Sequence, residues 1–433
     1  GGAEMLREMF VTVGTGRDRE DIGKALALSI RHHRADRVWC LVTSKSQDET
    51  LPVIRRELGT EGPPLEPILI EDENDAENCQ RQFQRAIAAR VAAGCRAADM
   101  AVDYTSGTKA MSAGLFAAAV AMGVETISYI AGRRDAGGRV MPGTERFTSF
   151  APRALFAQRE LEQATWLFDR YRFEEAAAFA ARAGRCGDPD IAARAQILAP
   201  LAEAFGDWDR FDHESAFRRL NSLGGDVRLE AWGMRGAVER GKQFLYRARE
   251  KGFPAERLAD LVANARRRLR EGKYDDAVAR GYRAYEYLAQ WRQDALGLNP
   301  VDLRWEALQA RLPAERQHAW RGRTEVEGRL RLGLRQDYEL LRDLGDPLGV
   351  AFCAAYAEED STLRKRLEQR NASILAHGTA AVGREAAEEL LELLERCARG
   401  QVERWDWLVA AATFPRLAGD RSPGVDAPRA TVS

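Results

Sequence analysis

The recognisable strand-forming runs of this sequence, which are short and rich in β-branched and aromatic residues, lie in its first 150 residues and alternate with helical stretches. Strands that alternate with helices form a mostly parallel sheet with helices on its faces. We therefore expect an α/β domain with a Rossmann-like fold over residues 1–150. The expected strands are 10–13, 38–43, 66–70, 99–104 and 124–130, the expected helices include 19–33 and 79–93, and a glycine-rich hairpin turn is expected at 132–140.

From about Leu155 onward the sequence has a period of 3.6 residues, with Ala, Leu, Arg and Glu dominant, so the remainder is predicted to be all-α. Segments 168–176 and 205–216 share a pattern of aromatic residue, turn, acidic residue and Ala. This repeat predicts two helical hairpins of tetratricopeptide-like character. The expected divisions are a helical connector over 151–252, a second helical domain over 253–415 and a disordered tail over 416–433.

Length and charge narrow the possible functions only slightly. A chain of 433 residues has room for about three domains, and its 45% hydrophobic residues suffice to bury a core in each. The formal net charge of −1 means that no field of the whole molecule attracts nucleic acid or an anionic membrane. The longest apolar run, 113–124, is too short to cross a bilayer, and the N-terminal residues lack the features of a signal peptide. We therefore expect a cytoplasmic protein with no membrane partner.

The sequence gives no reason to expect a metal or a cofactor. Its six cysteines lie far apart without a C-x-x-C pair, and its five histidines lack the spacing of a zinc site. The acidic loop 71–75 lacks the glycine and the final glutamate of a calcium-binding EF-hand. His32 and His33 fall at the end of the helix expected at 19–33, where a capping role is favoured.

The most informative turn follows the fourth expected strand, where Thr-Ser-Gly-Thr-Lys occupies 105–109 and a helix then runs to about Met122. At the carboxyl end of a parallel strand, the unpaired N–H groups of the next helix form a ready phosphate site. Gly107 allows close approach of a ligand, and Lys109 adds a full positive charge. The spacing is not that of a Walker loop, and Gly14-Thr15-Gly16 lacks the third glycine of a dinucleotide fingerprint. An ATPase or a dehydrogenase is therefore disfavoured, although the same residues would also serve simply as a helix cap.

A second constellation combines Arg370, Asn371, His377 and Gly378. If the helix continues to Gly378, residues seven apart return to one face, so Arg370 and His377 would project into one groove. An imidazole can move protons to and from ribose oxygens, and a guanidinium can stabilise a charged phosphorane, so the pair suits RNA cleavage. Asn371 would orient the phosphate or hold the backbone of the motif. The alternative is a solvated pair or a cap at the end of a helix.

The N-terminal third is similar to a known sensor family. The motif Asp-x-Thr-x-Gly-Thr-Lys-x-Met at 103–111 resembles the signature of CARF domains, the CRISPR-associated Rossmann-fold sensors of cyclic oligoadenylates, and the resemblance covers about residues 8–150. It implies a ligand site formed across a homodimer axis. The residues that it assigns to this site are Gly14, Thr15, Ser44, Thr105, Ser106, Gly107, Thr108, Lys109 and Met111.

The C-terminal part is similar to the HEPN ribonucleases. The motif at 370–377 resembles their R-x(4–6)-H motif, and segments 272–286 and 338–349 resemble two other parts of the same domain, in the order expected over about 255–412. The resemblance implies a composite site in which Arg370, Asn371 and His377 of two protomers face each other. It also implies cleavage without a metal, leaving a 2′,3′-cyclic phosphate.

Together these resemblances identify the chain as a CRISPR-associated ancillary ribonuclease of type III systems. The expected function is cleavage of single-stranded RNA in antiviral defence, activated by a cyclic oligoadenylate and carried out by a homodimer. One alternative is a ligand-gated regulatory protein without RNase output. Another is a sensor domain that degrades its own cyclic ligand, with Thr105, Ser106 or Lys109 positioning the 2′-hydroxyl. A DNA-binding regulator is disfavoured because no helix-turn-helix pattern follows residue 150.

One weaker signal stays open. Residues 304–335 contain eight arginines against four glutamates, with Trp305 and Trp320 among them. Arginines interleaved with aromatic residues can guide single-stranded RNA, although a solvated helical face is the simpler interpretation. The ring size of the activator and the base preference of the nuclease do not follow from the sequence.

Overall fold

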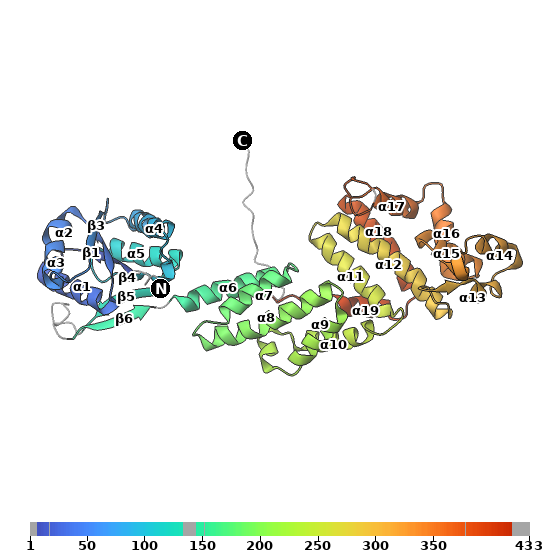
Figure 1. Ribbon diagram of the computed structural model, residues 1–433, viewed down its shortest axis with the longest axis horizontal. Coiled ribbons are helices and arrows are strands. Elements are labelled where there is room, and N and C mark those ends of the chain that lie inside the picture. The colour runs from blue at the N-terminus through green and yellow to red at the C-terminus, as the bar shows by residue number, and fades with distance from the viewer. Residues whose placement is uncertain (1–6, 17, 133–143, 151, 377, 418–433) are drawn as a thin grey trace. The chain divides into compact units, whose positions relative to one another are not determined.

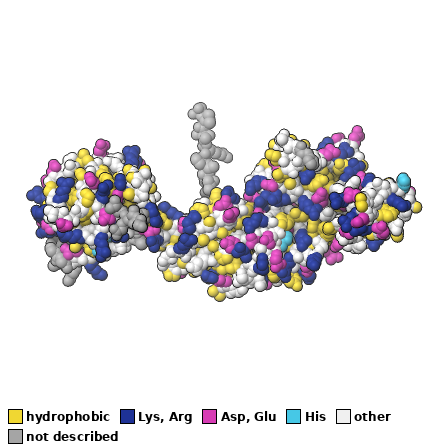
Figure 2. Space-filling view, in the orientation of Figure 1, with side chains coloured by type: hydrophobic (Ala, Val, Ile, Leu, Met, Phe, Trp, Pro, Cys, Tyr) yellow, Lys and Arg dark blue, Asp and Glu magenta, His cyan; other side chains and the backbone are white. Residues whose placement is uncertain are grey.

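The computed structural model describes residues 7–417 except 17, 133–143, 151 and 377 (Figure 1). The expected hairpin turn at 132–140 and the expected tail therefore lie almost wholly outside the described residues. The chain divides into two compact units, one of residues 1–158 with 186–188 and the other of residues 159–185 with 189–433. On the face drawn in Figure 2, basic and acidic side chains are interspersed over both units.

The first unit contains a six-stranded sheet among its described residues, with strand order β3-β2-β1-β4-β5-β6. Neighbouring strands are parallel except for β5 and β6, which are antiparallel. This topology confirms the Rossmann-like prediction and adds β6, a strand that the sequence did not reveal. The strands are β1 (Glu8–Val13), β2 (Arg37–Val42), β3 (Leu65–Leu69), β4 (Ala101–Asp103), β5 (Thr126–Ala131) and β6 (Arg146–Phe150).

Helices cover both faces of this sheet (Figure 1). Side chains alternate between the faces along β1, so Met9 and Val11 belong to one hydrophobic core and Phe10 to the other. α1 (Arg19–His33), α2 (Ser44–Glu49) and α3 (Leu51–Leu58) lie on the Met9 side, and α4 (Ala76–Ala92) and α5 (Lys109–Met122) lie on the Phe10 side. α2 begins directly after β2 because Thr43 forms a capping box with Ser46.

The second unit is almost entirely helical, as predicted. Its strands among the described residues are β7 (Leu303–Arg304) and β8 (Arg329–Leu330), which form a small antiparallel ladder, and an isolated bridge joins Ser373 to Ala380. In the described part of the chain, no helix is long and apolar enough to span a membrane. Its helices, together with α6, which begins in the first unit, are α6 (Arg153–Phe168), α7 (Phe173–Ala183), α8 (Pro189–Asp209), α9 (His213–Leu223), α10 (Arg235–Ala248), α11 (Ala255–Arg270), α12 (Tyr274–Ala295), α13 (Trp305–Gln309), α14 (Ala314–Arg321), α15 (Leu334–Asp343), α16 (Pro347–Ala357), α17 (Thr362–Asn371), α18 (Arg384–Arg399) and α19 (Trp405–Ala412).

The two predicted hairpins are present as α6–α7 and α8–α9. Each turns at an aromatic residue in the left-handed conformation, Tyr171 with φ 62° and Phe211 with φ 65°. The repeat in the sequence thus corresponds to one turn geometry used twice. Phe168 and Phe173 of the first hairpin pack against Phe205 of the second, which joins the two hairpins into one layer.

A buried polar network ties the second hairpin to α11. Arg267 lies 2.7 Å from an oxygen of Asp209 and 3.5 Å from one of Asp260, and Asp260 in turn contacts Nε2 of His213 at 2.7 Å. The guanidinium of Arg267 also stacks on the ring of Phe414, with its carbon 3.8 Å from the ring centre. This network packs the connector helices and the following helical domain together in one unit.

Candidate functional sites

Two glycines meet where β1 and β4 end. Gly107 has φ +94°, and a Cβ added to Gly14 would lie 2.7 Å from the Cα of Gly107, so only glycine fits there. The N–H of Gly14 donates to Oγ of Ser106 at 2.9 Å, and the hydroxyl of Thr12 donates to the carbonyl oxygen of Ser106 at 2.5 Å. Ser106 is buried, so its side chain joins the two loops from the inside.

Three of the predicted ligand residues hold the loop in shape. Oγ1 of Thr105 accepts a hydrogen bond from the N–H of Ile130 at 2.8 Å. Oγ1 of Thr108 caps α5 by accepting from the N–H of Met111 at 3.1 Å, and it donates to the carbonyl oxygen of Glu73. The side chain of Met111 is fully buried in the core. The hydroxyls of Thr105 and Thr108 therefore hold the 105–108 loop in place through hydrogen bonds to the backbone of Ile130, Met111 and Glu73.

Other predicted residues are exposed at the same edge. Lys109 is the exposed first residue of α5, and its ammonium group makes no hydrogen bond or ion pair within the described residues. Ser44 is the exposed first residue of α2, and Thr15 follows β1 and is half-buried. Because β2, β1 and β4 are neighbouring parallel strands, their carboxyl ends bring these side chains to one edge of the sheet. The start of α5 and the ammonium group make this edge attractive to an anion.

A buried network behind the loop was not predicted. The carboxylate of Asp103 accepts from the N–H of Thr105 at 2.8 Å and from the hydroxyls of Ser29 and Ser128. Nε2 of His33 lies 2.9 Å from Oγ of Ser128. His33 is therefore buried inside the sheet domain, where burial lowers its pKa, and the expectation that its side chain caps α1 is wrong. The α1 sequence predicts the helix end but not this long-range partner.

The sequence predicted that the motif at 370–377 lies on one continuous helix, and this prediction is wrong. α17 ends at Asn371, because the hydroxyl of Ser373 donates to the carbonyl oxygen of Arg370 at 2.8 Å and the backbone then turns. Gly378 does not stop the helix. A Cβ at Gly378 would lie 2.1 Å from the carbonyl oxygen of Ala372, so the chain returns here against the end of α17. His377 lies outside the described residues.

Arg370 is held against an aromatic ring. Its guanidinium carbon lies 4.4 Å from the ring centre of Tyr282 on α12, and Nη1 donates to Oδ1 of Asn371 at 3.3 Å. The Nε of Arg370 is buried and has no hydrogen-bond partner among the described residues. Burial raises the pKa of the Tyr282 hydroxyl, which keeps the ring neutral. The guanidinium is thus oriented by the ring, and its Nε is left for an additional acceptor.

The arginine-rich segment 304–335 is largely paired. Trp320 is buried and donates its N–H to Oδ2 of Asp343 at 2.9 Å, and Trp305 packs against the same core. Trp320 therefore offers no stacking surface for RNA, whereas Trp305 is partly exposed. Arg323 and Arg335 both pair with Glu339, at 3.2 and 2.9 Å. Arg335, at the end of the segment, also lines a cavity.

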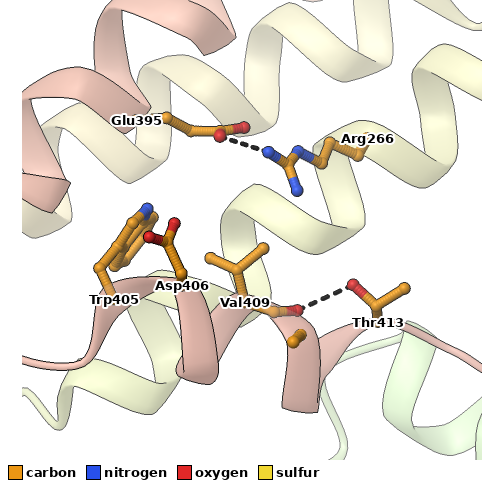
Figure 3. Close-up of a pocket in the computed structure, with 7 residues that line it drawn as sticks. Arg266, Glu395, Trp405, Asp406, Val409 and Thr413 are labelled. Carbon is orange, nitrogen blue, oxygen red and sulfur yellow. Dashed lines mark hydrogen bonds and ion pairs between the residues drawn. The ribbon is translucent and has the colours of Figure 1, made fainter.

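Two cavities lie within the helical unit. One, of about 290 Å³, is lined by α15, α16 and α17, the helix that ends in the Arg370–Asn371 motif. The other, of about 350 Å³, lies among α11, α18 and α19 (Figure 3). In this second cavity Arg266 is paired with Glu395, and Asp406 is paired with Arg399, so its charges already have partners. In the described part of the chain, no group of three or more His, Cys, Asp or Glu side chains is placed to hold a metal ion.

The Rossmann-like unit with its Gly107 loop, followed by a helical unit with an Arg370–Asn371 motif, defines the class of CRISPR-associated proteins that join CARF and HEPN domains. Residues 156–241 match the sequence profile of the Csm6 6H domain, and residues 247–401 match that of the Csm6 HEPN domain. Together the two matches span more than half of the chain. The chain belongs to the Csm6 family.

Two relatives extend this likeness over most of the chain. The CRISPR system endoribonuclease Csm6 of Thermus thermophilus is 29% identical over 409 residues, which is 86% of this chain and 82% of that protein. The solved structure of Enterococcus italicus Csm6 bound to cyclic hexa-2′-fluoro-hexa-dAMP has a TM-score of 0.59 and 14% identity. The match covers 94% of this chain and 98% of the Enterococcus italicus chain, so the two proteins share a fold.

Proposed function

We propose that this protein is an endoribonuclease that cleaves single-stranded RNA in type III CRISPR defence, with Arg370, Asn371 and His377 as its catalytic residues. The observation that carries this proposal is the HEPN match over 247–401, which encloses a motif whose arginine is oriented on Tyr282 with a free Nε. The sequence similarity to the CRISPR system endoribonuclease Csm6 of Thermus thermophilus supports the same activity for this chain.

The proposed reaction needs only proton transfers and charge stabilisation. The 2′-hydroxyl oxygen attacks the neighbouring phosphorus, the bond to the 5′-oxygen breaks, and the products are a 2′,3′-cyclic phosphate and a 5′-hydroxyl. A base removes the proton of the 2′-hydroxyl, an acid protonates the 5′-oxygen, and Arg370 stabilises the charge on the phosphorane. Because each chain offers one histidine in the motif, we assign the base and the acid to His377 of two protomers of a homodimer. No metal takes part in this scheme.

The proposed activator is a cyclic oligoadenylate that binds at the edge of the sheet formed by Thr15, Ser44, Lys109 and the 105–108 loop. A ring of nucleotides carries phosphates that suit the N-terminus of α5 and the ammonium group of Lys109. The cyclic hexanucleotide bound to the Enterococcus italicus relative supports this choice. A ring with two-fold symmetry fits a dimer axis, on which each protomer contributes the same residues.

Each of the proposed domains has its own role. Residues 1–150 bind the activator, 151–252 connect the domains, 253–415 cleave RNA, and 416–433 form a tail. Binding of the activator can raise the rate of cleavage only if the ligand prefers the arrangement in which the nuclease site is complete. The proposed connector packs against α11 through Arg267 and Asp209, which gives it a physical route to the nuclease domain.

A cleavage assay with purified protein tests the proposal. Single-stranded RNA is incubated with each cyclic oligoadenylate in turn, and one ring size is expected to stimulate cleavage. Arg370→Ala and His377→Ala should each remove this activity, whereas Lys365→Ala, an exposed residue of the same helix, should retain it. Lys109→Ala should raise the activator concentration that is needed, with the exposed Lys24→Ala on α1 as its control. Retained cleavage in His377→Ala would exclude the proposed catalytic site.

A further inference from the structure

The cavity of about 290 Å³ combines an aromatic ring with charges of both signs. Three arginines line it, together with two glutamates and a tyrosine whose ring is half-buried. These residues come from three different helices of the same unit, α15, α16 and α17. They are Arg335, Glu339, Arg342, Tyr356, Arg364 and Glu368.

The cavity adjoins the Arg370–Asn371 motif. On α17, Arg364, Glu368 and Asn371 are spaced i, i+4 and i+7, so they lie along one face of the helix. At 1.5 Å per residue this stripe is about 10 Å long, which brings the cavity within two turns of the motif. Tyr282 also lies between the motif and the cavity. The guanidinium of Arg370 lies on its ring, and the hydroxyl of Tyr356 adds to burial in raising the pKa of Tyr282.

The lining residues are held in place by one another. The guanidinium carbon of Arg335 lies 5.4 Å from the ring centre of Tyr356, and its Nε lies 2.9 Å from Oε1 of Glu339. Arg364 donates to the carbonyl oxygens of Tyr356 and Glu359 at 3.4 and 2.8 Å, which fixes the end of α16. A rigid site of this kind loses little conformational entropy when a ligand binds.

The chemistry of the lining matches a single nucleotide. An aromatic face provides stacking for a base, and guanidinium groups provide hydrogen bonds for a phosphate. Three arginines against two glutamates leave the cavity with a net positive charge. The side chain of Glu368 is exposed and its carboxylate has no partner among the described residues, so it can accept from an N–H on the edge of a base. The volume is at the small end of ligand pockets, which suits one nucleotide and not a larger ligand.

We propose that this cavity binds one nucleotide of the RNA strand close to the scissile phosphate, with its base on the ring of Tyr356 and an N–H of the base donating to Glu368. The inference rests on the proposed function, because it names where the same substrate is held. Arg335 contacts the phosphate through its Nη groups, because its ion pair with Glu339 uses Nε. The cavity thereby determines where along the strand the nuclease cuts.

Binding and cleavage are measured separately on the full chain, so that the two proposals can fail independently. A short RNA in which every ribose is 2′-O-methylated cannot be cleaved, and its binding is followed by fluorescence anisotropy. Tyr356→Ala should weaken binding by about 5- to 150-fold, the range expected from the loss of one base stack, and Tyr356→Phe should restore it. With cleavable RNA, Tyr356→Ala should raise KM more than it lowers kcat.

The carboxylate provides a second variant that leaves the core intact. Glu368→Gln should redistribute cleavage among the phosphodiester bonds of a mixed-sequence RNA, whereas Glu392→Gln, an exposed residue of α18, should leave the pattern unchanged. Binding and cleavage that are unaffected by both Tyr356→Ala and Glu368→Gln would overturn the subsite. Binding that depends on Tyr356 without any cleavage by the parent protein would overturn the nuclease and retain the subsite.

Discussion

Arg370 illustrates how a single side chain is prepared for an anion. Its guanidinium lies on the ring of Tyr282, and its Nε is buried without a partner among the described residues. Such an unpaired buried donor is costly unless a ligand completes its hydrogen bonds. Under the proposed function the missing acceptor is a phosphate oxygen, and Tyr282 is a positioning residue.

The role of Tyr282 can be tested by changing only its ring. Tyr282→Leu should lower kcat for RNA cleavage by about 2- to 30-fold, the range that corresponds to one cation–π contact, because the guanidinium is no longer oriented. KM should change less. Tyr282→Phe should stay within about twofold of the parent, since the face of the ring is kept. Equal kcat values for the Leu and Phe variants would show that the ring does not position Arg370.

Gly378 provides a test of the loop that follows α17. Because a Cβ at this position would lie 2.1 Å from the carbonyl oxygen of Ala372, Gly378→Ala should displace the loop and lower RNA cleavage by about tenfold or more. The matched control is Gly383→Ala, where a Cβ would meet nothing within 4 Å. Thermal unfolding of both variants should stay close to that of the parent. A Gly378→Ala protein with full activity would contradict the importance of this close approach.

Residue types alone identified the motif, but not the contacts that shape it. Arg370 and Asn371 stand out because their neighbours match a known pattern, whereas Tyr282 is 88 positions away along the chain and looks like any helix residue. The same limit applies to Ser106 and Thr108. Their hydroxyls are bonded to Gly14 and Glu73, and such long-range partners have no local signal.

At the scale of elements, the pattern of the sequence predicted whether a segment is a helix or a strand, but it placed the ends of these elements poorly. The predicted strands overlap those of the sheet, because a short apolar run rich in β-branched and aromatic residues is a local property of the sequence. α2 and α3 were not predicted, since they are short and begin at a cap. The prediction extended α17 too far, because residues 372–378 contain no helix breaker before Gly378, whereas the observed turn depends on contacts such as those from Ser373 to Arg370 and from Ala380 to Ala372.

The contact between α12 and α15 contains a carboxylate with an altered pKa. Burial raises the pKa of Asp337 to about 6, although its Oδ1 accepts from Nε2 of Gln293 at 2.9 Å. The folded protein therefore binds this proton more tightly than the unfolded chain does. The stability that the group contributes is fully present below its ordinary pKa and is lost as the pH rises through about 6.

Asp337→Asn should remove the free-energy cost of ionising this buried carboxyl group and keep an acceptor for Gln293. The shift of about two units corresponds to about 3 kcal/mol, so at pH 8 the variant should be more stable than the parent by up to that amount. At pH 5 the gain should be about half as large. Thermal unfolding at the two pH values measures the difference. A gain that is equal at both values would show that Asp337 does not titrate in this range.

At the scale of the whole molecule, the boundary between the two compact units falls at residue 158, inside α6. The chain therefore passes from one unit to the other as a helix. The change from short β-rich apolar runs to a period of 3.6 residues led the sequence analysis to place a boundary near this position, at residue 150. The packing of the proposed connector on α11 could not be predicted, because Asp209 and Arg267 are residue types that usually lie on the surface, and only the fold buries Arg267 beside Asp209.

A stiff helix at this boundary should matter for activation. Arg159→Gly combined with Gln163→Gly changes two exposed residues of α6 and weakens the helix by about 2 kcal/mol, whereas alanines at both positions preserve it. The glycine pair should bind the activator normally and cleave RNA about threefold or more slowly at saturating activator. Titrations of activator in the cleavage assay, with calorimetry on the full chain, separate the two effects. Identical rates for both pairs would argue against transmission through α6.

The meeting of Gly14 with Gly107 has a consequence for how this family can diversify. A Cβ at Gly14 would collide with the backbone of Gly107, and Gly107 itself has φ +94°, so neither position accepts another residue without strain. If the proposed activator site is correct, new ligand preferences arise at the positions around the pair, such as the half-buried 15 and the exposed 44 and 109. The two glycines form a fixed frame, and the recognition of different rings can evolve around it without rebuilding the turn.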